Sequence, residues 1–243
     1  MIVTGASSGI GAACAARAVG AGYRVVLAAR DQSRLAETVA RLGGGDRAVG
    51  IGCDVTSWDE QQSLVDQCLE RFGRLDVVVA SAGTNARMGL LESTPEAWRS
   101  VVLTNVLGPA LTVRATLPHL LDRGTGHYVF IGSLAASGRL PGSVYGATKA
   151  AVASLAESVR AELLSVRQIP GIRVTLVELG AVATAMTPAD RLPFTALGPD
   201  DVAASIVDAV DRPEHVGVDR SPCARPPSRS DCVATYPLPL GRW

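Results

Sequence analysis

The sequence has no excess of charge of either sign, because 23 lysine and arginine residues balance 23 aspartate and glutamate residues. This balance argues against a nucleic acid or an anionic membrane as a partner. No apolar run approaches the roughly 20 residues that a membrane span needs. Residues 1–5 also lack the basic segment and cleavage site of a signal peptide. Together these absences predict neither a nucleic-acid partner nor a membrane location, and no export of the protein.

Cysteine is scarce and irregularly placed. The five cysteines stand at positions 14, 53, 68, 223 and 232, without a spacing typical of a metal site. Their odd number and scattered positions are typical of reduced thiols in the cytoplasm. We therefore expect no bound metal.

Lysine occurs once, at Lys149, although arginine is plentiful. A compact ammonium with rotatable donors does work that a planar guanidinium does badly. Tyr145 precedes Lys149 by four residues, so both side chains rise from one face of a helix. A cation near a phenol, whose reference pKa is about 10, lowers that pKa and makes the tyrosine a usable general acid or base. Ser133 ends an apolar run and can offer its hydroxyl to a substrate oxygen. The alternative is a chance Tyr-x-x-x-Lys pentad on a solvated helix.

The N-terminal segment combines an apolar strand with a glycine-rich turn. An alanine-rich helix follows, up to about Gly20. Gly5, Gly9 and Gly11 lie between strand and helix, where glycine lets the backbone approach a pyrophosphate and the free N–H groups of the helix start attract it. The spacing differs from the general Gly-x-Gly-x-x-Gly fingerprint, but its position indicates a dinucleotide site.

The second apolar strand, residues 24–29, predicts which dinucleotide binds. An acidic residue at the tip of this strand holds the ribose hydroxyls in dinucleotide folds, and an arginine nearby accommodates a 2′-phosphate. Ala29 carries no carboxylate, so Arg30 is a candidate phosphate clamp and NADP(H) is expected to be preferred over NAD(H). The alternative is that Asp31 caps the helix 32–42 while Arg30 is solvated.

Apolar strands and amphipathic helices alternate along the rest of the chain. A helix is expected from a capping box at Ser57–Glu60, another begins at Thr94, and a long helix contains Asn105. Near-continuous apolar strands in this alternation predict a single α/β domain of Rossmann type. Its doubly wound parallel sheet carries helices on both faces. The further strands are expected at residues 48–53, 75–80, 128–131 and 173–177.

In the order and approximate spacing of these motifs, residues 1–215 resemble the short-chain dehydrogenases/reductases. The resemblance implies hydride transfer between a nicotinamide and a carbonyl or secondary alcohol, without a metal. It implies a catalytic tetrad of Asn105, Ser133, Tyr145 and Lys149, with Asn105 fixing a water that joins Lys149 to solvent. It also implies cofactor contacts, together with Arg30, Tyr145 and Lys149, at Gly5, Ser7, Ser8, Gly9, Ile10, Gly11, Asp54, Val55, Ser81, Ala82, Gly83, Gly180, Val182 and Thr184. A short apolar segment, residues 184–200, stands where the family carries its substrate lid.

Three features depart from the family pattern. Ala80-Ser81-Ala82-Gly83 replaces Asn-Asn-Ala-Gly, so two amide contacts that steady the cofactor loop are lost. Leu179 replaces a proline near the nicotinamide. The segment 219–243 is rich in proline, which does not fit a central strand. We therefore expect a catalytic domain of residues 1–218, without the usual last strand, and an irregular tail of residues 219–243.

Two functions follow from these observations. The first is an active oxidoreductase with a small-molecule carbonyl or alcohol substrate. The alternative is a catalytically silent NADP(H)-binding module. A homodimer is expected, because the helices around residues 105–121 and 150–164 have apolar residues to spare, among them Leu107, Val113 and Leu163. Without the last strand the second interface of the family's tetramers would not form.

Overall fold

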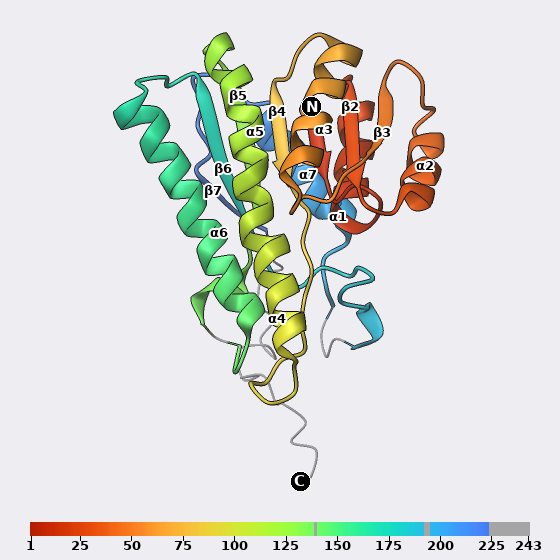
Figure 1. Ribbon diagram of the computed structural model, residues 1–243, viewed down its shortest axis with the longest axis vertical. Helices are drawn as coiled ribbons and strands as arrows, with labels where there is room; N and C mark the ends of the chain where they lie inside the picture. Colours follow the sequence, from red (N-terminus) through yellow and green to blue (C-terminus); the bar gives the residue numbers. More distant parts are fainter. Residues whose placement is uncertain (139, 192–194, 224–243) are drawn as a thin grey trace.

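The computed structural model describes residues 1–138, 140–191 and 195–223, and within them it contains a parallel sheet of seven strands in the order β3-β2-β1-β4-β5-β6-β7 (Figure 1). The α/β fold that the sequence predicts is confirmed. The strands are β1 (Ile2–Thr4), β2 (Val25–Ala29), β3 (Ala48–Gly52), β4 (Val77–Ala80), β5 (Gly126–Ile131), β6 (Ile172–Leu179) and β7 (Arg220–Cys223). The α-helices are α1 (Gly9–Gly20), α2 (Gln32–Arg41), α3 (Trp58–Phe72), α4 (Pro95–Val102), α5 (Gly108–Arg123), α6 (Val144–Ala161) and α7 (Pro199–Val210). Short 3-10 and π segments are η1 (Leu103–Leu107), η2 (Leu134–Ser137), η3 (Glu162–Val166) and η4 (Ala189–Arg191).

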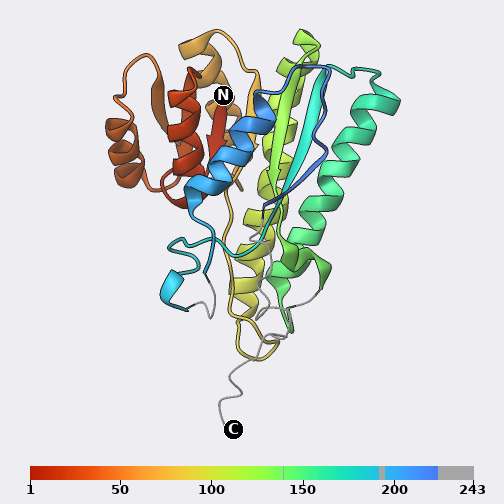
Figure 2. The same cartoon turned by 180° about the vertical axis from the view of Figure 1, so that it is seen from behind.

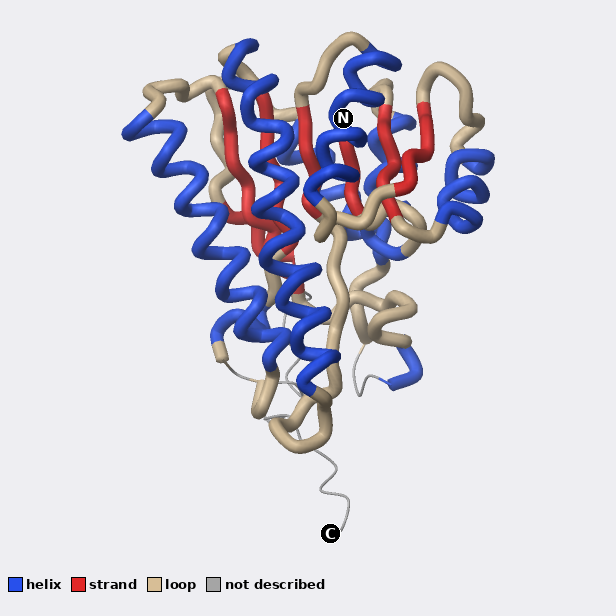
Figure 3. The backbone as a smooth tube through the Cα atoms, viewed as in Figure 1, coloured by secondary structure: helices blue, strands red, loops and turns tan. Residues whose placement is uncertain are grey.

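Helices cover both faces of the sheet, because alternate residues of each strand point to opposite sides. Ile2 packs against the cluster that α3, α5 and α6 complete, while Val3 packs against the cluster of α1, α2 and α7. Figures 1 and 2 show these two helix layers from opposite sides, and Figure 3 shows the strands between them. Apolar runs in the sequence therefore mark strands that are buried on both faces.

Helix starts follow the polar residues that the sequence indicates. Asp31 and Thr94 each accept a backbone N–H of the helix that follows, so the expected cap of α2 is confirmed. Ser57 likewise accepts the N–H of Glu60. The expected capping box of α3 is only half formed, however, because the Glu60 carboxylate accepts the N–H of Asp54 at 2.7 Å.

The expectation that the sheet lacks its last strand is wrong. β7 pairs in parallel with β6, with Pro222 opposite Glu178. The carbonyl oxygen of Asp219 accepts the N–H of Leu176 in β6, and that of Cys223 accepts the N–H of Gly180 just after β6. The backbone N–H and carbonyl groups of the odd-numbered residues in this segment therefore point toward β6. Pro222 therefore turns its nitrogen toward the open edge, where a missing N–H costs no ladder bond. The sheet extends past the expected boundary at 218 to Cys223, and residues 224–243 lie outside the described part of the chain.

One helical stretch, Pro95–Arg123, is long and apolar enough to cross a membrane by length and composition. It comprises α4, the π-helical segment η1 and α5. Its residues Val101, Val113 and Leu120 are buried in the protein. Val113 and Leu120 pack in the core cluster on one face of the sheet, as expected of a helix that covers a sheet.

Candidate active site

The carboxyl ends of β1 and β4 lie side by side in the sheet, at the point where the strand order reverses. A crevice that binds ligands opens at such a position in doubly wound sheets. The hydroxyl of Thr4, at the end of β1, accepts the N–H groups of Ser81 and Ala82, each at 3.1 Å. The segment after β4 is thus held to the first turn even without the two asparagines of the family pattern.

Two positions of the turn between β1 and α1 have no room for a side chain. Gly5 has a φ of +68°, and a Cβ there would lie 2.7 Å from the Cα of Ala82. A Cβ at Gly11 would collide with the carbonyl oxygen of Gly5. Ser7 and Ser8 lie in this turn, and Ser8 does not cap α1 with its side chain. The first turn of α1 also contains no acidic residue, so its N–H groups, including that of Ile10, fit an anionic pyrophosphate.

The structure brings Ser133 and Tyr145 together. Ser133 follows β5 and starts η2 by accepting the N–H of Ala135 at 3.1 Å. Ser143 starts α6 by accepting the N–H of Gly146 at 3.0 Å. Gly146 then lets α6 approach η2 closely, since a Cβ there would lie 2.8 Å from the carbonyl oxygen of Ala135. This approach places Ser133 close enough to Tyr145 for its hydroxyl to lower the pKa of the phenol.

Lys149 lies one helical turn after Tyr145 and is buried. Its ammonium donates to the carbonyl oxygen of Ile131 at 2.7 Å and lies 5.6 Å from the centre of the Tyr145 ring. Burial lowers the pKa of Lys149 to about 8. The expected lowering of the Tyr145 pKa is wrong for this geometry, because burial raises that pKa and only the hydrogen bond with Ser133 opposes the rise. Burial of the phenol is the larger of the two effects, so the pKa lies above its ordinary value.

Asn105 lies in η1, a π-helical turn between α4 and α5, and such turns are frequent at functional sites. Its side-chain amide donates to the carbonyl oxygen of Thr84 at 2.9 Å and to the hydroxyl of Thr148 at 3.0 Å. Its side-chain oxygen accepts the N–H of Thr84 at 2.8 Å, beside Gly83. Both N–H hydrogens of the amide are thus used within the protein, and the water-holding role that the resemblance implies for Asn105 stays a prediction. Asn105 instead ties the loop after β4 to α6, next to Lys149.

The segment after β6 reaches the same crevice. Gly180 donates its N–H to the carbonyl of Cys223 in β7 at 3.0 Å, and Val182 is buried. Thr184 and Thr187 close a turn by exchanging two backbone hydrogen bonds. A Cβ on Gly9 would lie 3.4 Å from the methyl group of Thr184, so the expected nicotinamide segment touches the start of α1. Within the expected substrate segment, residues 192–194 lie outside the described chain.

Arg30 follows β2, and 69% of its side chain is exposed. Its Nη1 lies 4.0 Å from Oδ2 of Asp54, which follows β3. Partial burial raises the pKa of Asp54, but hydrogen bonds from Thr56 and the charge of Arg30 outweigh it and hold that pKa below its ordinary value. Asp31 caps α2, so both interpretations of the Arg30-Asp31 pair remain compatible with this arrangement.

Four residues that help to form the site were not predicted as site residues: Thr4, Gln61, Gly146 and Thr148. Gly146 and Thr148 belong to the Tyr145–Lys149 pentad, and Thr4 precedes the glycine turn. Their positions within these motifs could have identified them as site residues. Gln61 carried none, because a glutamine on an amphipathic helix normally faces solvent.

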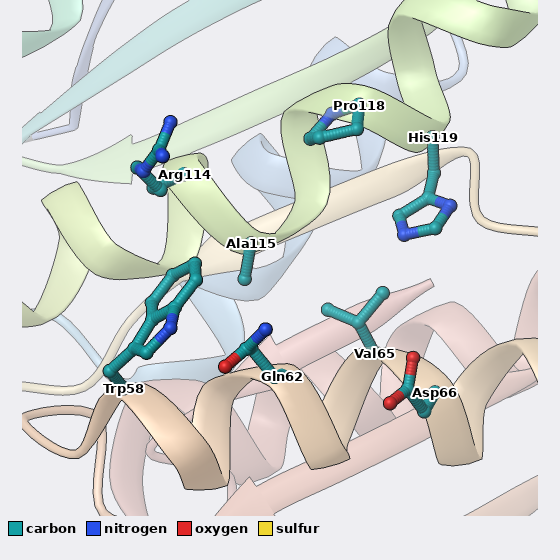
Figure 4. A pocket seen from close by; sticks show the side chains of 8 residues that line it. All are labelled: Trp58, Gln62, Val65, Asp66, Arg114, Ala115, Pro118 and His119. Carbon is teal, nitrogen blue, oxygen red and sulfur yellow. The ribbon is translucent and has the colours of Figure 1, made fainter.

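A separate cavity of about 250 Å³ lies between α3 and α5 (Figure 4). Trp58 and Asp66 line it from α3, and Arg114 and His119 from α5. The Arg114 guanidinium lies 5.9 Å from the centre of the Trp58 ring. No predicted site residue lines this cavity. Among the described residues, no three His, Cys, Asp or Glu side chains cluster in a way that could hold a metal ion.

Comparisons with known proteins identify the family of the chain. The family model described as short chain dehydrogenase matches residues 1–192. An uncharacterized oxidoreductase of Staphylococcus saprophyticus is 36% identical over 221 residues, covering 89% of this chain and 93% of that protein.

Solved structures of similar proteins include nicotinamide cofactors of both kinds. An alcohol dehydrogenase from the archaeon Thermococcus sibiricus, complexed with 5-hydroxy-NADP, has a TM-score of 0.80 and 28% identity, covering 93% of this chain and 97% of that chain. A 3-ketoacyl-(acyl-carrier-protein) reductase from Brucella melitensis, complexed with NADH, has a TM-score of 0.81 and 26% identity, covering 91% and 94%. With a matching family model over most of its length, the chain belongs to the short-chain dehydrogenase/reductase family of oxidoreductases.

Proposed function

We propose that the protein transfers a hydride between NADP(H) and a carbonyl or secondary alcohol, with Tyr145 as the general acid or base. The observation that carries this proposal is the contact of Tyr145 with Ser133, above a buried Lys149. When bound, the nicotinamide cofactor supplies or accepts the hydride. The glycine turn fits its pyrophosphate, because the start of α1, which no side chain caps and which has no acidic residue in its first turn, offers free N–H groups.

In the reductive direction, Tyr145 Oη and Ser133 Oγ hydrogen-bond the substrate oxygen, and Tyr145 Oη transfers its proton to that oxygen. Burial keeps the Tyr145 phenol protonated, which is the form that a general acid needs, and the raised pKa also makes it a weaker acid than a free phenol. Lys149 gives one N–H to the Ile131 carbonyl and retains two donors, which suit the hydroxyls of a ribose. Asn105 acts by positioning Thr148 and the loop after β4.

Turnover tests this proposal directly. Purified protein is assayed with NADPH or NADH and a panel of ketones and aldehydes, and with the oxidised cofactors and secondary alcohols. Reduction of at least one carbonyl class is expected. Inactivity on every substrate, with NADPH binding still measurable by fluorescence, would support the silent cofactor-binding module instead.

We further propose that NADP(H) is preferred over NAD(H). Ala29 offers no carboxylate to a ribose, and Arg30 is exposed and can bond a 2′-phosphate. One charge-assisted hydrogen bond is worth about 1.5 to 3 kcal/mol, so the preference should be at least about tenfold. The dissociation constants of both cofactors are compared in wild type and in Ala29→Asp/Arg30→Ser, with Arg34→Ser as the matched control. Equal wild-type affinities, or an unchanged ratio in the double variant, would sink the assignment.

A homodimer is also proposed. Val102, Leu107, Leu164 and Val166 are large apolar residues that are at least 39% exposed on the helical segments around α4, α5 and α6. Val113, expected to face outward, lies in the core instead, as does Leu163. The exposed set still gives an apolar surface that a second copy would cover. Light scattering should report a dimer for wild type and a monomer for Leu107→Glu/Leu164→Glu; a wild-type monomer would contradict the proposal.

Finally, we propose that the protein works in the cytoplasm. Cys14, Cys53, Cys68 and Cys223 are free thiols buried in the described chain, which suits a reducing compartment. Fractionation of the native cells with an antibody against the protein tests this. Recovery outside the cytoplasmic fraction would refute it.

A further inference from the structure

Two neighbouring residues near the start of α3 hold the loop that follows β3. The Glu60 carboxylate accepts the N–H of Asp54 at 2.7 Å. The Gln61 side-chain amide donates to the carbonyl oxygen of Val55 at 3.0 Å. Consecutive residues of the helix thus fix consecutive residues of the loop.

Gln61 is fully buried, although glutamine is rarely found inside proteins. Its amide nitrogen also donates to the hydroxyl of Thr112 at 2.9 Å and lies 3.4 Å from the carbonyl oxygen of Gly108. Two N–H hydrogens therefore serve three acceptors on two different elements. Its Oε1 has no partner among the described groups, so the nitrogen alone ties the side chain to its surroundings. Gln61 links the loop to α5, the helix that continues from the Asn105 segment.

Val55 is fixed through its side chain as well. A Cβ placed on Gly108 would lie 2.8 Å from Cγ2 of Val55, so the loop packs tightly against the start of α5. In contrast, the Val55 N–H makes no hydrogen bond within the described residues. The neighbouring Asp54 uses Oδ1 to accept the N–H and hydroxyl of Thr56, at 2.9 and 2.8 Å. Oδ2 of Asp54 has only Arg30 nearby, at 4.0 Å.

The loop therefore presents one free acceptor, Asp54 Oδ2, and one free donor, Val55 N–H, on adjacent residues. The edge of an adenine presents the complementary pair, an amino group next to a ring nitrogen that accepts a hydrogen bond. Binding of both requires that the two loop groups keep their relative positions. Those positions are set by bonds from Glu60 and Gln61, which make no contact with the loop's free groups.

We infer that Glu60 and Gln61 are positioning residues for the adenine end of the cofactor, an assignment that rests on the proposed cofactor binding. They act through Asp54 and Val55. Their loss should weaken binding of the adenosine half of the cofactor and leave the nicotinamide half unaffected. A purely structural role in the core would weaken both halves together.

Four variants test this inference. Gln61→Met keeps the length of the side chain and removes the amide, and Glu60→Ala removes the carboxylate from an exposed position where folding is not at risk. Glu60→Gln keeps an acceptor oxygen and should restore binding. Gln67→Met is the matched control, because Gln67 lies on the same helix and is exposed.

Binding is measured by calorimetry with two probes, adenosine 2′,5′-bisphosphate and reduced nicotinamide mononucleotide. Gln61→Met and Glu60→Ala should each raise the dissociation constant of the adenosine probe about tenfold, the effect of one lost hydrogen bond. Neither should change the affinity for the mononucleotide. Hydrogen exchange of the two bonded amides, those of Asp54 and Thr56, measured without any ligand, should speed up in both variants and stay at the wild-type rate in Glu60→Gln and Gln67→Met.

The outcomes separate this inference from the proposed function. Equal losses for both probes, or unchanged adenosine affinity in the variants, would overturn the positioning role while cofactor binding stands. Unchanged exchange at Asp54 and Thr56 would overturn it as well. Failure of the wild type to bind the adenosine probe would refute the proposed cofactor binding and this inference with it.

Discussion

The stability of the protein should depend on pH through a histidine far from the candidate active site. His127 lies in β5 and is 1% exposed. Its Nε2 lies 2.8 Å from the hydroxyl of Thr175, and that hydroxyl donates to the carbonyl oxygen of Val218 at 2.6 Å. The Thr175 hydroxyl already donates its only hydrogen to Val218, so it can only accept from His127, and the imidazole must carry its proton on Nε2. Nδ1 is then a bare nitrogen, and it has no partner among the described groups.

Protonation of Nδ1 would place an unpaired charge inside the sheet. Burial and, to a smaller extent, the nearby charge of Arg173 lower the pKa of His127 to about 3, from an ordinary value of 6.5. The unfolded chain therefore binds this proton at a higher pH than the folded chain does. The contribution of His127 to the free energy of unfolding is complete above the pKa of the unfolded histidine, and it is lost as the pH falls below that value. Between pH 7 and pH 5 the loss should be about 2 kcal/mol.

Urea unfolding at pH 7 and pH 5 measures this loss. His127→Gln keeps an N–H donor for Thr175 and does not titrate, so its free energy of unfolding should change by about 2 kcal/mol less than that of wild type over this range. His119→Gln, which removes a half-exposed imidazole of α5, controls for substitution of a histidine. If wild type and His127→Gln show the same pH dependence, His127 does not stay neutral in the fold and the reasoning fails.

Three further outcomes are expected. Tyr145→Phe should abolish turnover and leave the dissociation constant of NADPH near that of wild type, which assays and fluorescence titration would check; retained turnover would remove Tyr145 from the chemistry. Lys149→Arg should lose most of kcat, because a guanidinium does not fit the buried ammonium site; a kcat near that of wild type would mean that Lys149 is a generic cation. A chain ending at Val218 loses β7 and should melt at least about 4 °C lower in calorimetry; an unchanged Tm would show that β7 contributes nothing to stability.

The sequence allowed the sheet and the helix starts to be predicted because both depend on local features. A strand buried on both faces is a short apolar run, and a capped helix begins after a residue such as Asp31 or Thr94 whose side chain accepts an N–H. The register of Tyr145 and Lys149 is likewise a property of one helix. Features confined to one element were therefore accessible before any tertiary structure was known.

Features that depend on a second element were missed. The sequence does not reveal that the ammonium of Lys149 meets the carbonyl of Ile131, so it gave the wrong direction for the pKa of Tyr145. Gln61 is buried only because carbonyl groups of the loop after β3 and of α5 converge on it. Pro222 is compatible with a strand only at an open edge, and its position at that edge follows from the order of all seven strands.

The departures from the family pattern bear on the choice between an enzyme and a silent module. The loss of asparagines after β4 indicated a loose cofactor loop, but Thr4 holds that loop from one side and Asn105 from the other. The proline-rich end indicated a missing strand, but β7 forms and its Cys223 carbonyl holds Gly180 in place. The two features that argued for a silent module, a loose loop and a missing strand, are thus both answered by hydrogen bonds that the sequence alone did not reveal. What remains at the centre of the site is a phenol with a serine hydroxyl near it and a buried ammonium, and this arrangement gives no structural reason to prefer a silent module over an oxidoreductase.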